Sequence, residues 1–322
     1  KENIETNYKD VEVMLVDCMY YVNKFFDKVT TTAYSEMAKK IPQTWGKVYW
    51  HAQSGPIAQI STTSNKLLSK KLNTLLKNFN PELIISTHPF ASTMCAYLKK
   101  QGKLPQDKDT KFIAFGGDGG TYDIGLQSLS GAMERGHDML YVCYDNGAYM
   151  NTGIQRSSAT PKFADTTTSP AGKVTPGKMQ VRKDLAKVMV GHHIPYVAQT
   201  LAMNNFKDLY EKAEKAIYTE GPAFLNVMAP CPRGWGYATE DLMKINKLAV
   251  ETCYWPLYEV VDGKYKINYK PAKKLPIEEF LRPQKRFKHM FKPGNEWMIE
   301  EFQKEVDKRW QRLLNLEELT NN

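Results

Sequence analysis

The sequence has few cysteines, and none of them are paired at short spacing. The chain has 322 residues and five cysteines, Cys18, Cys95, Cys143, Cys231 and Cys253. No two of them form a CxxC pair, and an odd, sparse set is typical of a protein in a reducing compartment. This pattern excludes a small disulfide-stapled fold and favours a cytoplasmic protein.

Long apolar runs are also missing. No run of 18 or more apolar residues occurs, so we expect no transmembrane helix. The first ten residues, KENIETNYKD, have no apolar stretch behind a basic end, and we therefore expect no signal peptide there. The composition, 42% hydrophobic and 25% charged, is that of an ordinary globular protein and excludes a disordered or collagen-like chain.

Arginine is absent from residues 1–104, although the chain contains eight. That segment has 14 lysines and 8 acidic residues, a net charge of +6, and the other 218 residues add +3 to give the total of +9. The break coincides with a polar stretch, KKQGKLPQDKD, from Lys99 to Asp109, which is typical of a linker. We predict two domains, residues 1–104 and residues 105–322. The basic charge indicates a solvated lysine-rich surface, and we expect no nucleic-acid partner.

Both segments show the strand and helix alternation of parallel βαβ units. In the first, the pattern predicts strands at Val11–Val16 and Leu83–Ser86 and helices at Ser64–Phe79 and Ala91–Lys100. In the second, it predicts strands at Lys111–Phe115, Met139–Tyr144, Tyr196–Gln199 and Phe224–Met228, and helices at Tyr122–Glu134, Lys183–Val190, Phe206–Tyr218 and Glu296–Leu314. A long polar loop from Ala148 to Met179 interrupts the alternation, and loops of that length are usually functional. The fold class is α/β, with a parallel sheet and helices on both faces.

A glycine cluster, GGDGG, joins the strand at Lys111–Phe115 to the next helix. Such a turn is an anion site, because glycines admit a phosphate and the helix amino terminus supplies N–H groups. Asp118 within it would repel a diphosphate unless a divalent cation lay between them, and Mg²⁺ is commonly shared by a carboxylate and phosphates. Asn146, at the end of the neighbouring strand, would supply a second ligand. Two structural alternatives remain: Asp118 as a helix cap, and Asn146-Gly147 as an ordinary turn.

The spacing of GDG to Asn146 is similar to the signature of thiamine diphosphate enzymes. The segments GGDGGTYDIGLQSLSGAMERGHD, YDNGAYMNTGIQRSSATP and APCPRGWG resemble the β subunit of pyruvate:ferredoxin oxidoreductase and of related 2-oxoacid:ferredoxin oxidoreductases. The resemblance extends from about Asp109 to the end of the chain. It implies a Rossmann-like domain that binds thiamine diphosphate.

The resemblance also implies which residues hold the cofactor. Three glycines would hold the diphosphate, three residues would bind Mg²⁺, and one asparagine would face the thiazolium and the substrate. These are, in that order, Gly117, Gly119 and Gly120; Asp118, Asn146 and the carbonyl of Ala148; and Asn151. Asn151 is therefore the expected catalytic residue.

The sequence contains only part of the cysteine pattern that binds an iron–sulfur cluster in this family. Cys231 matches the downstream cysteine of the family's [4Fe–4S] cluster. The family's upstream CxxC pair is missing, since residues 1–104 contain only Cys18 and Cys95, which are 77 positions apart. The sequence therefore leaves open whether a cluster assembles on this chain.

The implied reaction is the oxidative decarboxylation of pyruvate, or of a related 2-oxoacid, to an acyl-coenzyme A. Electrons would pass to ferredoxin. The implied partners are an α subunit, and in some relatives γ and δ subunits, with an active site shared between subunits. This chemistry is typical of anaerobic metabolism, and the basic charge of the chain is compatible with an acidic ferredoxin.

The first 104 residues resemble a different family. The stretches VEVMLVDCMY and NPELIISTHPFASTMCAYLKKQGKL are similar to the amino-terminal domain of processive diacylglycerol glycosyltransferases, the relatives of monogalactosyldiacylglycerol synthase. The glycine-rich opening loop of that family is missing, which argues against a working glycosyltransferase. Two alternatives stay open beside the oxidoreductase subunit: a lipid glycosyltransferase fragment, and an inactive assembly subunit. The two resemblances together suggest a chimera.

Overall fold

The computed structural model describes residues 12, 14–16, 71–81, 83–86, 95, 98, 102 and 111–321. The chain divides into two compact units, Lys1–Thr110 and Lys111–Asn322. In the first unit, residues 71–79 are helical, and strand β1 spans Leu83–Ser86, as predicted. The strand prediction at Val11–Val16 is wrong for its described residues, 12 and 14–16, which have no regular structure. Of the helix predicted at Ala91–Lys100, the described residues Cys95 and Leu98 are helical, and its other residues, like residues 64–70 of the helix predicted at Ser64–Phe79, lie outside the described residues.

The second unit is built on six strands. They are β2 (Lys111–Gly117), β3 (Met139–Asp145), β4 (Tyr196–Leu201), β5 (Ala223–Met228), β6 (Tyr258–Val261) and β7 (Lys264–Ile267). In this unit their order across the sheet is β2-β3-β5-β4-β6-β7. The first four strands are parallel, and β6 and β7 are antiparallel to their neighbours. The predicted α/β class is confirmed, but one edge of the sheet is not parallel.

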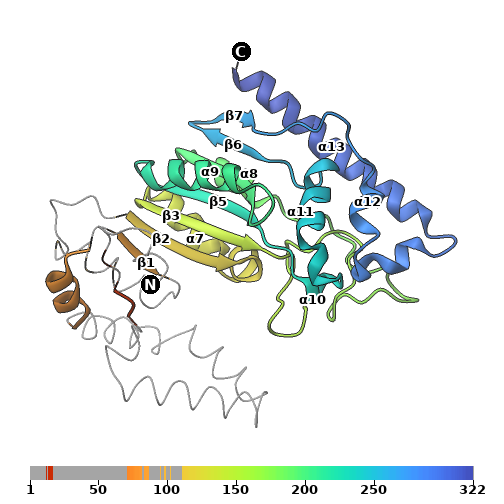
Figure 1. The fold of residues 1–322 in the computed structure, drawn as a ribbon, viewed down its shortest axis with the longest axis horizontal. Coiled ribbons are helices and arrows are strands. Elements are labelled where there is room, and N and C mark those ends of the chain that lie inside the picture. Colours follow the sequence, from red (N-terminus) through yellow and green to blue (C-terminus); the bar gives the residue numbers. More distant parts are fainter. Residues whose placement is uncertain are drawn as a thin grey trace, which may run out of the picture. The chain divides into compact units, whose positions relative to one another are not determined.

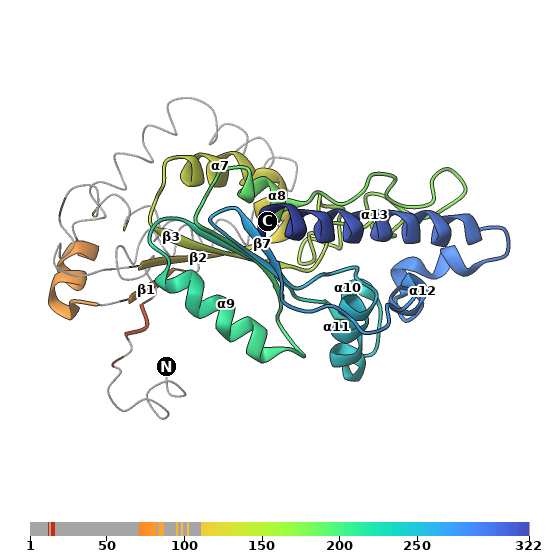
Figure 2. The same cartoon turned by 90° about the horizontal axis from the view of Figure 1, so that it is seen from above.

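Helices cover both faces of this sheet (Figure 2). On one face α9 (Phe206–Tyr218) packs against β4 and β5. On the other lie α7 (Leu126–Glu134), α8 (Leu185–Val190) and the long α13 (Glu296–Asn321). Alternate residues of β3 face opposite cores, Leu140 and Val142 towards α9 and Cys143 towards α7 and α8. The strands are therefore buried on both sides, as expected for a parallel sheet.

A third core closes the end of the sheet from which β5 leads into α10 (Figure 1). Short helices supply it: α10 (Pro232–Trp235), α11 (Leu242–Glu251), α12 (Ile277–Leu281), and 3₁₀ turns at Thr239–Asp241 and Lys285–Phe291. Trp235, Trp255, Phe280 and Phe302 are among its buried side chains. Among the described helices, none is long and apolar enough to cross a bilayer.

Local sequence explains most of the element boundaries. Asn205 caps α9 by accepting a hydrogen bond from the Asp208 amide, and the helix covers the predicted range. The helix predicted over Tyr122–Glu134 begins instead as a π-helical turn, Gly119–Ile124, which contains Tyr122, and continues as α7 from Leu126. The sequence analysis missed the β6–β7 hairpin, whose turn residues Asp262 and Gly263 both have positive φ, 48° and 81°.

Candidate active site

The parallel register brings three chain segments to one edge of the sheet. Gly117, the last residue of β2, lies opposite Tyr144 of β3, and Asp145 of β3 lies opposite Met228 of β5. The residues that follow these strands therefore emerge side by side (Figure 1). The GGDGG turn, the loop after Asp145 and the APCPRGWG segment meet there, although they are far apart in the sequence. The Ala229 amide donates to the Asp145 carbonyl at 2.8 Å, which fixes the third segment beside the second.

The Asn146 side-chain amide lies between two oxygen acceptors at the centre of this edge. With its nitrogen turned towards them, it donates to the Ala148 carbonyl at 2.7 Å and to Oδ1 of Asp118 at 2.8 Å. With its oxygen turned inward instead, a cation between the three groups would have to offset the repulsion among the oxygens. A carboxylate, a side-chain amide and a backbone carbonyl thus converge here, and all three carry oxygen atoms of the kind that Mg²⁺ prefers.

Asp118 is a buried carboxyl group, only 1% exposed. Burial, and next the neighbouring Asp145 carboxylate, raise the pKa of Asp118 to about 7, against the lowering effect of its hydrogen bond from Ser157. The Ser157 hydroxyl donates to Oδ2 at 2.6 Å, and the backbone N–H of Asn146 donates to Oδ1 at 3.2 Å. Asp118 makes no side-chain cap to the helical turn that follows it. The alternative of a simple helix cap is therefore wrong.

The glycines of the turn have different surroundings. A Cβ atom on Gly119 would lie 2.3 Å from the Tyr149 ring, and the Tyr149 hydroxyl is fixed by donating to the Gly119 carbonyl. A Cβ on Gly117 would lie 3.3 Å from the Tyr144 ring. Nothing lies within 4 Å of a Cβ on Gly120, which is exposed. Gly119 is therefore required by packing, whereas Gly120 presents open backbone to a ligand.

A buried ion pair lies close enough to Asp118 to affect its pKa. Asp145 accepts from the Arg182 guanidinium and, at 2.6 Å, from the Tyr122 hydroxyl. Further contacts offset the free-energy cost of burying the two charges. Arg182 also lies over the Trp255 ring at 4.7 Å, and Asn226 donates to the Tyr122 hydroxyl. Arg182 neutralises Asp145, which leaves Asp118 as the carboxylate available to a cation.

The predicted long loop is packed rather than extended. Ser157, Thr160 and Phe163 within it are buried, and the Thr160 hydroxyl donates to the Gly147 carbonyl at 2.7 Å. Lys178 is buried beneath the same turn and donates to the backbone carbonyls of Ser158 and Thr160. The loop thus fixes Ser157 against Asp118.

Replacing Lys178 by methionine should remove a pH dependence of stability. Burial, followed by the charges of Arg156 and Arg182, lowers the pKa of Lys178 from 10.5 to about 7. Between those values the unfolded chain binds more protons at this site than the folded chain. The free energy of unfolding therefore rises with pH, by up to about 1.4 kcal/mol per pH unit. Urea denaturation at pH 7, 8 and 9 should show this rise in the wild type relative to K178M. The exposed Lys173→Met variant of the same loop should keep it, and equal slopes in all three proteins would contradict the assignment.

The structure places the other two predicted site residues near this edge. Asn151 is exposed and lies in the turn that follows residues 146–148, the metal loop, which contains two of the predicted Mg²⁺ ligands. Cys231 is half-buried at the start of α10, where its Sγ accepts from the Gly234 amide at 3.4 Å. Among the described residues, no group of three or more histidine, cysteine or acidic side chains could hold a metal. The roles of both residues stay predictions.

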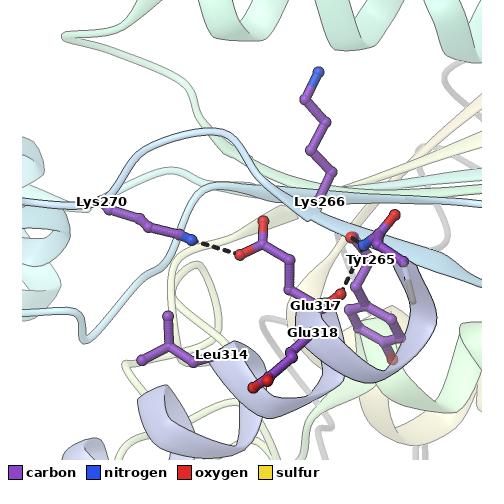
Figure 3. Close-up of a pocket in the computed structure, with 7 residues that line it drawn as sticks. Tyr265, Lys266, Lys270, Leu314, Glu317 and Glu318 are labelled. Atoms are coloured by element: carbon purple, nitrogen blue, oxygen red, sulfur yellow. Dashed lines mark hydrogen bonds and ion pairs between the residues drawn. The ribbon is translucent and has the colours of Figure 1, made fainter.

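A surface groove of about 560 Å³ lies elsewhere, between β7 and the end of α13 (Figure 3). Glu317 in it pairs with Lys270 at 2.6 Å and accepts from the Ile267 amide at 2.6 Å. The Thr320 hydroxyl accepts from the Tyr265 amide, and Asn321 donates to the Tyr265 carbonyl. These groups satisfy one another, so the groove is a contact between helix and strand rather than a second candidate site.

Comparisons with known proteins identify the family of the chain. The model of the family described as thiamine pyrophosphate enzyme, C-terminal TPP binding domain, matches residues 82–227. Pyruvate synthase subunit PorB of Thermotoga maritima is 50% identical over 242 residues, which cover 75% of this chain and 74% of that protein. The chain belongs to the PorB family of pyruvate synthase subunits. The resemblance seen in the sequence is thereby confirmed.

Relatives of the PorB family include proteins with another named substrate. Ketoisovalerate oxidoreductase subunit VorB of Pyrococcus abyssi is 47% identical over 227 residues, 70% of this chain and 71% of that protein. A solved 2-oxoglutarate:ferredoxin oxidoreductase from Magnetococcus marinus is 24% identical, with a TM-score of 0.38, over 47% of this chain and 54% of that one. The family model of monogalactosyldiacylglycerol synthase matches residues 1–107, in agreement with the resemblance of the first 104 residues to that family.

Sequence reasoning missed two residues of the site, Ser157 and Trp235. Ser157 donates to Asp118 across 39 positions, and the Trp235 indole donates to the Asn146 carbonyl across 89. Trp235 lies within the APCPRGWG motif, which was noted only for its cysteine. No local spacing signals either contact.

Proposed function

We propose that the chain is the thiamine-diphosphate-binding β subunit of a 2-oxoacid:ferredoxin oxidoreductase that acts on pyruvate. The observation that supports this most directly is the convergence of the Asp118 carboxylate, the Asn146 side-chain amide and the Ala148 carbonyl, with Asp118 two residues before the open backbone of Gly120. One carboxylate, one amide and one carbonyl suit Mg²⁺, which prefers oxygen ligands and keeps positions for phosphate oxygens.

The residues of the chain would divide the work of binding. Asp118, Asn146 and the Ala148 carbonyl would hold Mg²⁺, and Gly117, Gly119 and Gly120 would receive the diphosphate. Asn151, exposed in the turn after the metal loop, would face the thiazolium and the 2-oxoacid. When bound, the cofactor supplies the carbon nucleophile and the electron sink that decarboxylation requires. The buried Arg182–Asp145 pair would keep a second carboxylate from competing for the ion.

The remaining reactants would come from partners. Coenzyme A would take the acyl group, and two electrons would leave singly to ferredoxin through iron–sulfur clusters. An α subunit, with γ and δ subunits in some assemblies, would complete the shared active site. We place such an enzyme in the cytoplasm of an anaerobic cell. Cys231 is the candidate cluster ligand, and anaerobic iron analysis of the assembled complex distinguishes an electron-transferring subunit from an inactive assembly subunit.

The substrate assignment is tested by turnover. The complex, prepared anaerobically with a family α subunit, should reduce ferredoxin with pyruvate and coenzyme A. It should do so faster than with 3-methyl-2-oxobutanoate, the substrate class that the VorB names indicate. Faster turnover of the branched acid would transfer the assignment to that substrate. No turnover with either acid, despite bound cofactor, would favour the assembly subunit.

The first unit raises a separate proposal, that the chain is a chimera. Residues 1–107 match the monogalactosyldiacylglycerol synthase model, and residues 82–227 match the thiamine diphosphate model. A lipid glycosyltransferase fragment is the second candidate for this unit, supported only by that match. Sequencing the source DNA across the codons for residues 95–115 tests the chimera, and one continuous expressed frame with both parts would overturn it.

A further inference from the structure

Trp235 contacts the backbone of the metal loop. Its indole N–H donates to the carbonyl oxygen of Asn146 at 2.6 Å, and the side chain is 3% exposed. Asn146 lies between the end of β3 and Gly147, whose φ of 75° turns the chain sharply. The hydrogen bond therefore holds the backbone between the Asn146 side-chain amide, which lies 2.8 Å from Oδ1 of Asp118, and the Ala148 carbonyl, which lies 2.7 Å from the same amide.

Arg286 supports this contact from behind. Its guanidinium lies 3.8 Å from the centre of the Trp235 ring, an arrangement in which a cation is attracted to the ring face. Its Nη1 lies 3.3 Å from the Cβ position of Gly147, so the same group also touches the metal loop. Gln284 accepts from its Nε at 2.9 Å, and within the described residues its buried Nη2 has no hydrogen-bond partner. Arg286 thus packs against both Trp235 and the loop.

The turn that contains Trp235 has little freedom to move. A Cβ atom on Gly234 would lie 2.2 Å from Sδ of Met150, so this turn is pressed against the loop after the metal ligands. The Trp235 amide donates to the Cys231 carbonyl at 2.9 Å, and Gly236 ends α10 with a φ of 73°. The indole is consequently presented to Asn146 by a rigid support.

We infer that Trp235, backed by Arg286, is a positioning residue for Mg²⁺ in the reaction proposed above, on which this inference rests. Without the indole N–H, the Asn146 peptide can rotate, and the Asn146 side chain and the Ala148 carbonyl no longer converge beside Asp118. Groups that orient metal ligands in this way typically change metal affinity by about 10- to 100-fold when they are removed. Trp235 itself touches neither the ion nor the substrate.

The chain contains a matched control for this test. Trp255 is also buried, its indole N–H donates to the Thr200 carbonyl at 2.8 Å, and the Arg182 guanidinium lies over its ring at 4.7 Å. Its acceptor belongs to β4 and not to the metal loop. The variants Trp235→Phe and Trp255→Phe each remove one indole hydrogen bond to a backbone carbonyl, and each keeps an aromatic ring. A merely structural role predicts the same behaviour for both.

The experiment is a calorimetric titration of Mg²⁺ into the full chain, assembled with a family α subunit, at a fixed excess of thiamine diphosphate. We expect the half-saturating Mg²⁺ concentration to rise about 10- to 100-fold in W235F and less than about twofold in W255F. At saturating Mg²⁺, both variants should bind the wild-type amount of cofactor, which shows that the site is intact. Thermal midpoints should fall by similar amounts.

The outcomes separate the two proposals. Equal shifts in W235F and W255F, with a wild type that binds normally, would overturn the positioning role and leave the proposed function standing. A wild-type complex that binds no thiamine diphosphate at any Mg²⁺ concentration would overturn both. A W235F complex that never saturates while its thermal midpoint matches that of W255F would show that Trp235 is required for the site itself, which contradicts a role in affinity alone.

Discussion

Asp118→Asn is expected to weaken Mg²⁺-dependent binding of thiamine diphosphate by about 100-fold or more. Mg²⁺ prefers charged oxygen ligands, and Asp118 is the only carboxylate among the three groups proposed to hold it, the others being the Asn146 side chain and the Ala148 carbonyl. The amide has the same size and can still accept the Ser157 hydrogen bond through its oxygen, so the change removes the charge and the longer hydrogen bond from the Asn146 backbone N–H. Calorimetric titration of the cofactor in the presence of Mg²⁺ measures the loss.

A measurement of thermal stability distinguishes the loss of metal binding in D118N from misfolding. Burial already penalises the charge of Asp118 and raises its pKa to about 7. At pH 8 a neutral amide avoids that penalty, so the metal-free variant should unfold at the same temperature as the wild type or higher. Asp138→Asn is the control, because this carboxylate lies just before β3, at the opposite end of the strand, and pairs with Lys111. D138N should bind cofactor normally. Normal binding by D118N would falsify the metal assignment.

Gly119→Ala should destabilise the fold by about 1–3 kcal/mol, whereas Gly120→Ala should leave stability almost unchanged. The added methyl of Gly119→Ala would meet the Tyr149 ring at 2.3 Å, and that ring cannot turn away without losing its hydrogen bond to the Gly119 carbonyl. The methyl of Gly120→Ala meets nothing within 4 Å. Denaturant unfolding of the two variants measures the difference.

The Gly120→Ala variant should affect cofactor binding although it does not affect stability. If the diphosphate approaches the open backbone of Gly120, a methyl group there obstructs it in a chain that folds normally. We therefore expect G120A to keep wild-type stability and to lose affinity for thiamine diphosphate. Wild-type affinity in G120A would exclude Gly120 from the diphosphate site. Equal stability of G119A and G120A would show that Tyr149 gives way and that Gly119 has no packing role.

The core of the site could be predicted because it depends on local patterns. A strand followed by GGDGG, and the next strand followed by Asp-Asn-Gly, places Asp118 and Asn146 at the same edge of a parallel sheet, and the register confirms that placement. The sequence also contained a turn signal that was not used. Asp262-Gly263 between short apolar stretches is typical of a hairpin, and it produces the antiparallel edge of the sheet.

The supporting residues could not be predicted, because their contacts depend on how distant segments fold together. Ser157 reaches Asp118 only because Lys178 and Thr160 fold the long loop back on the sheet. Trp235 reaches Asn146 because β5 ends beside β3, so that the following segment crosses the metal loop. Neither contact leaves a periodicity or a spacing in the sequence. One sequence alone therefore indicates the ligands of a site better than the groups that orient them.

The last turn of α13 has a consequence for association between molecules. β7 is an edge strand, and an edge strand normally offers free backbone N–H and C=O groups to a strand of another chain. Here the Tyr265 and Ile267 amides donate to Thr320 and Glu317, and Asn321 donates to the Tyr265 carbonyl. Side chains of one helix turn thus occupy the groups through which sheets join edge to edge. The end of α13 protects the protein from aggregation by strand addition.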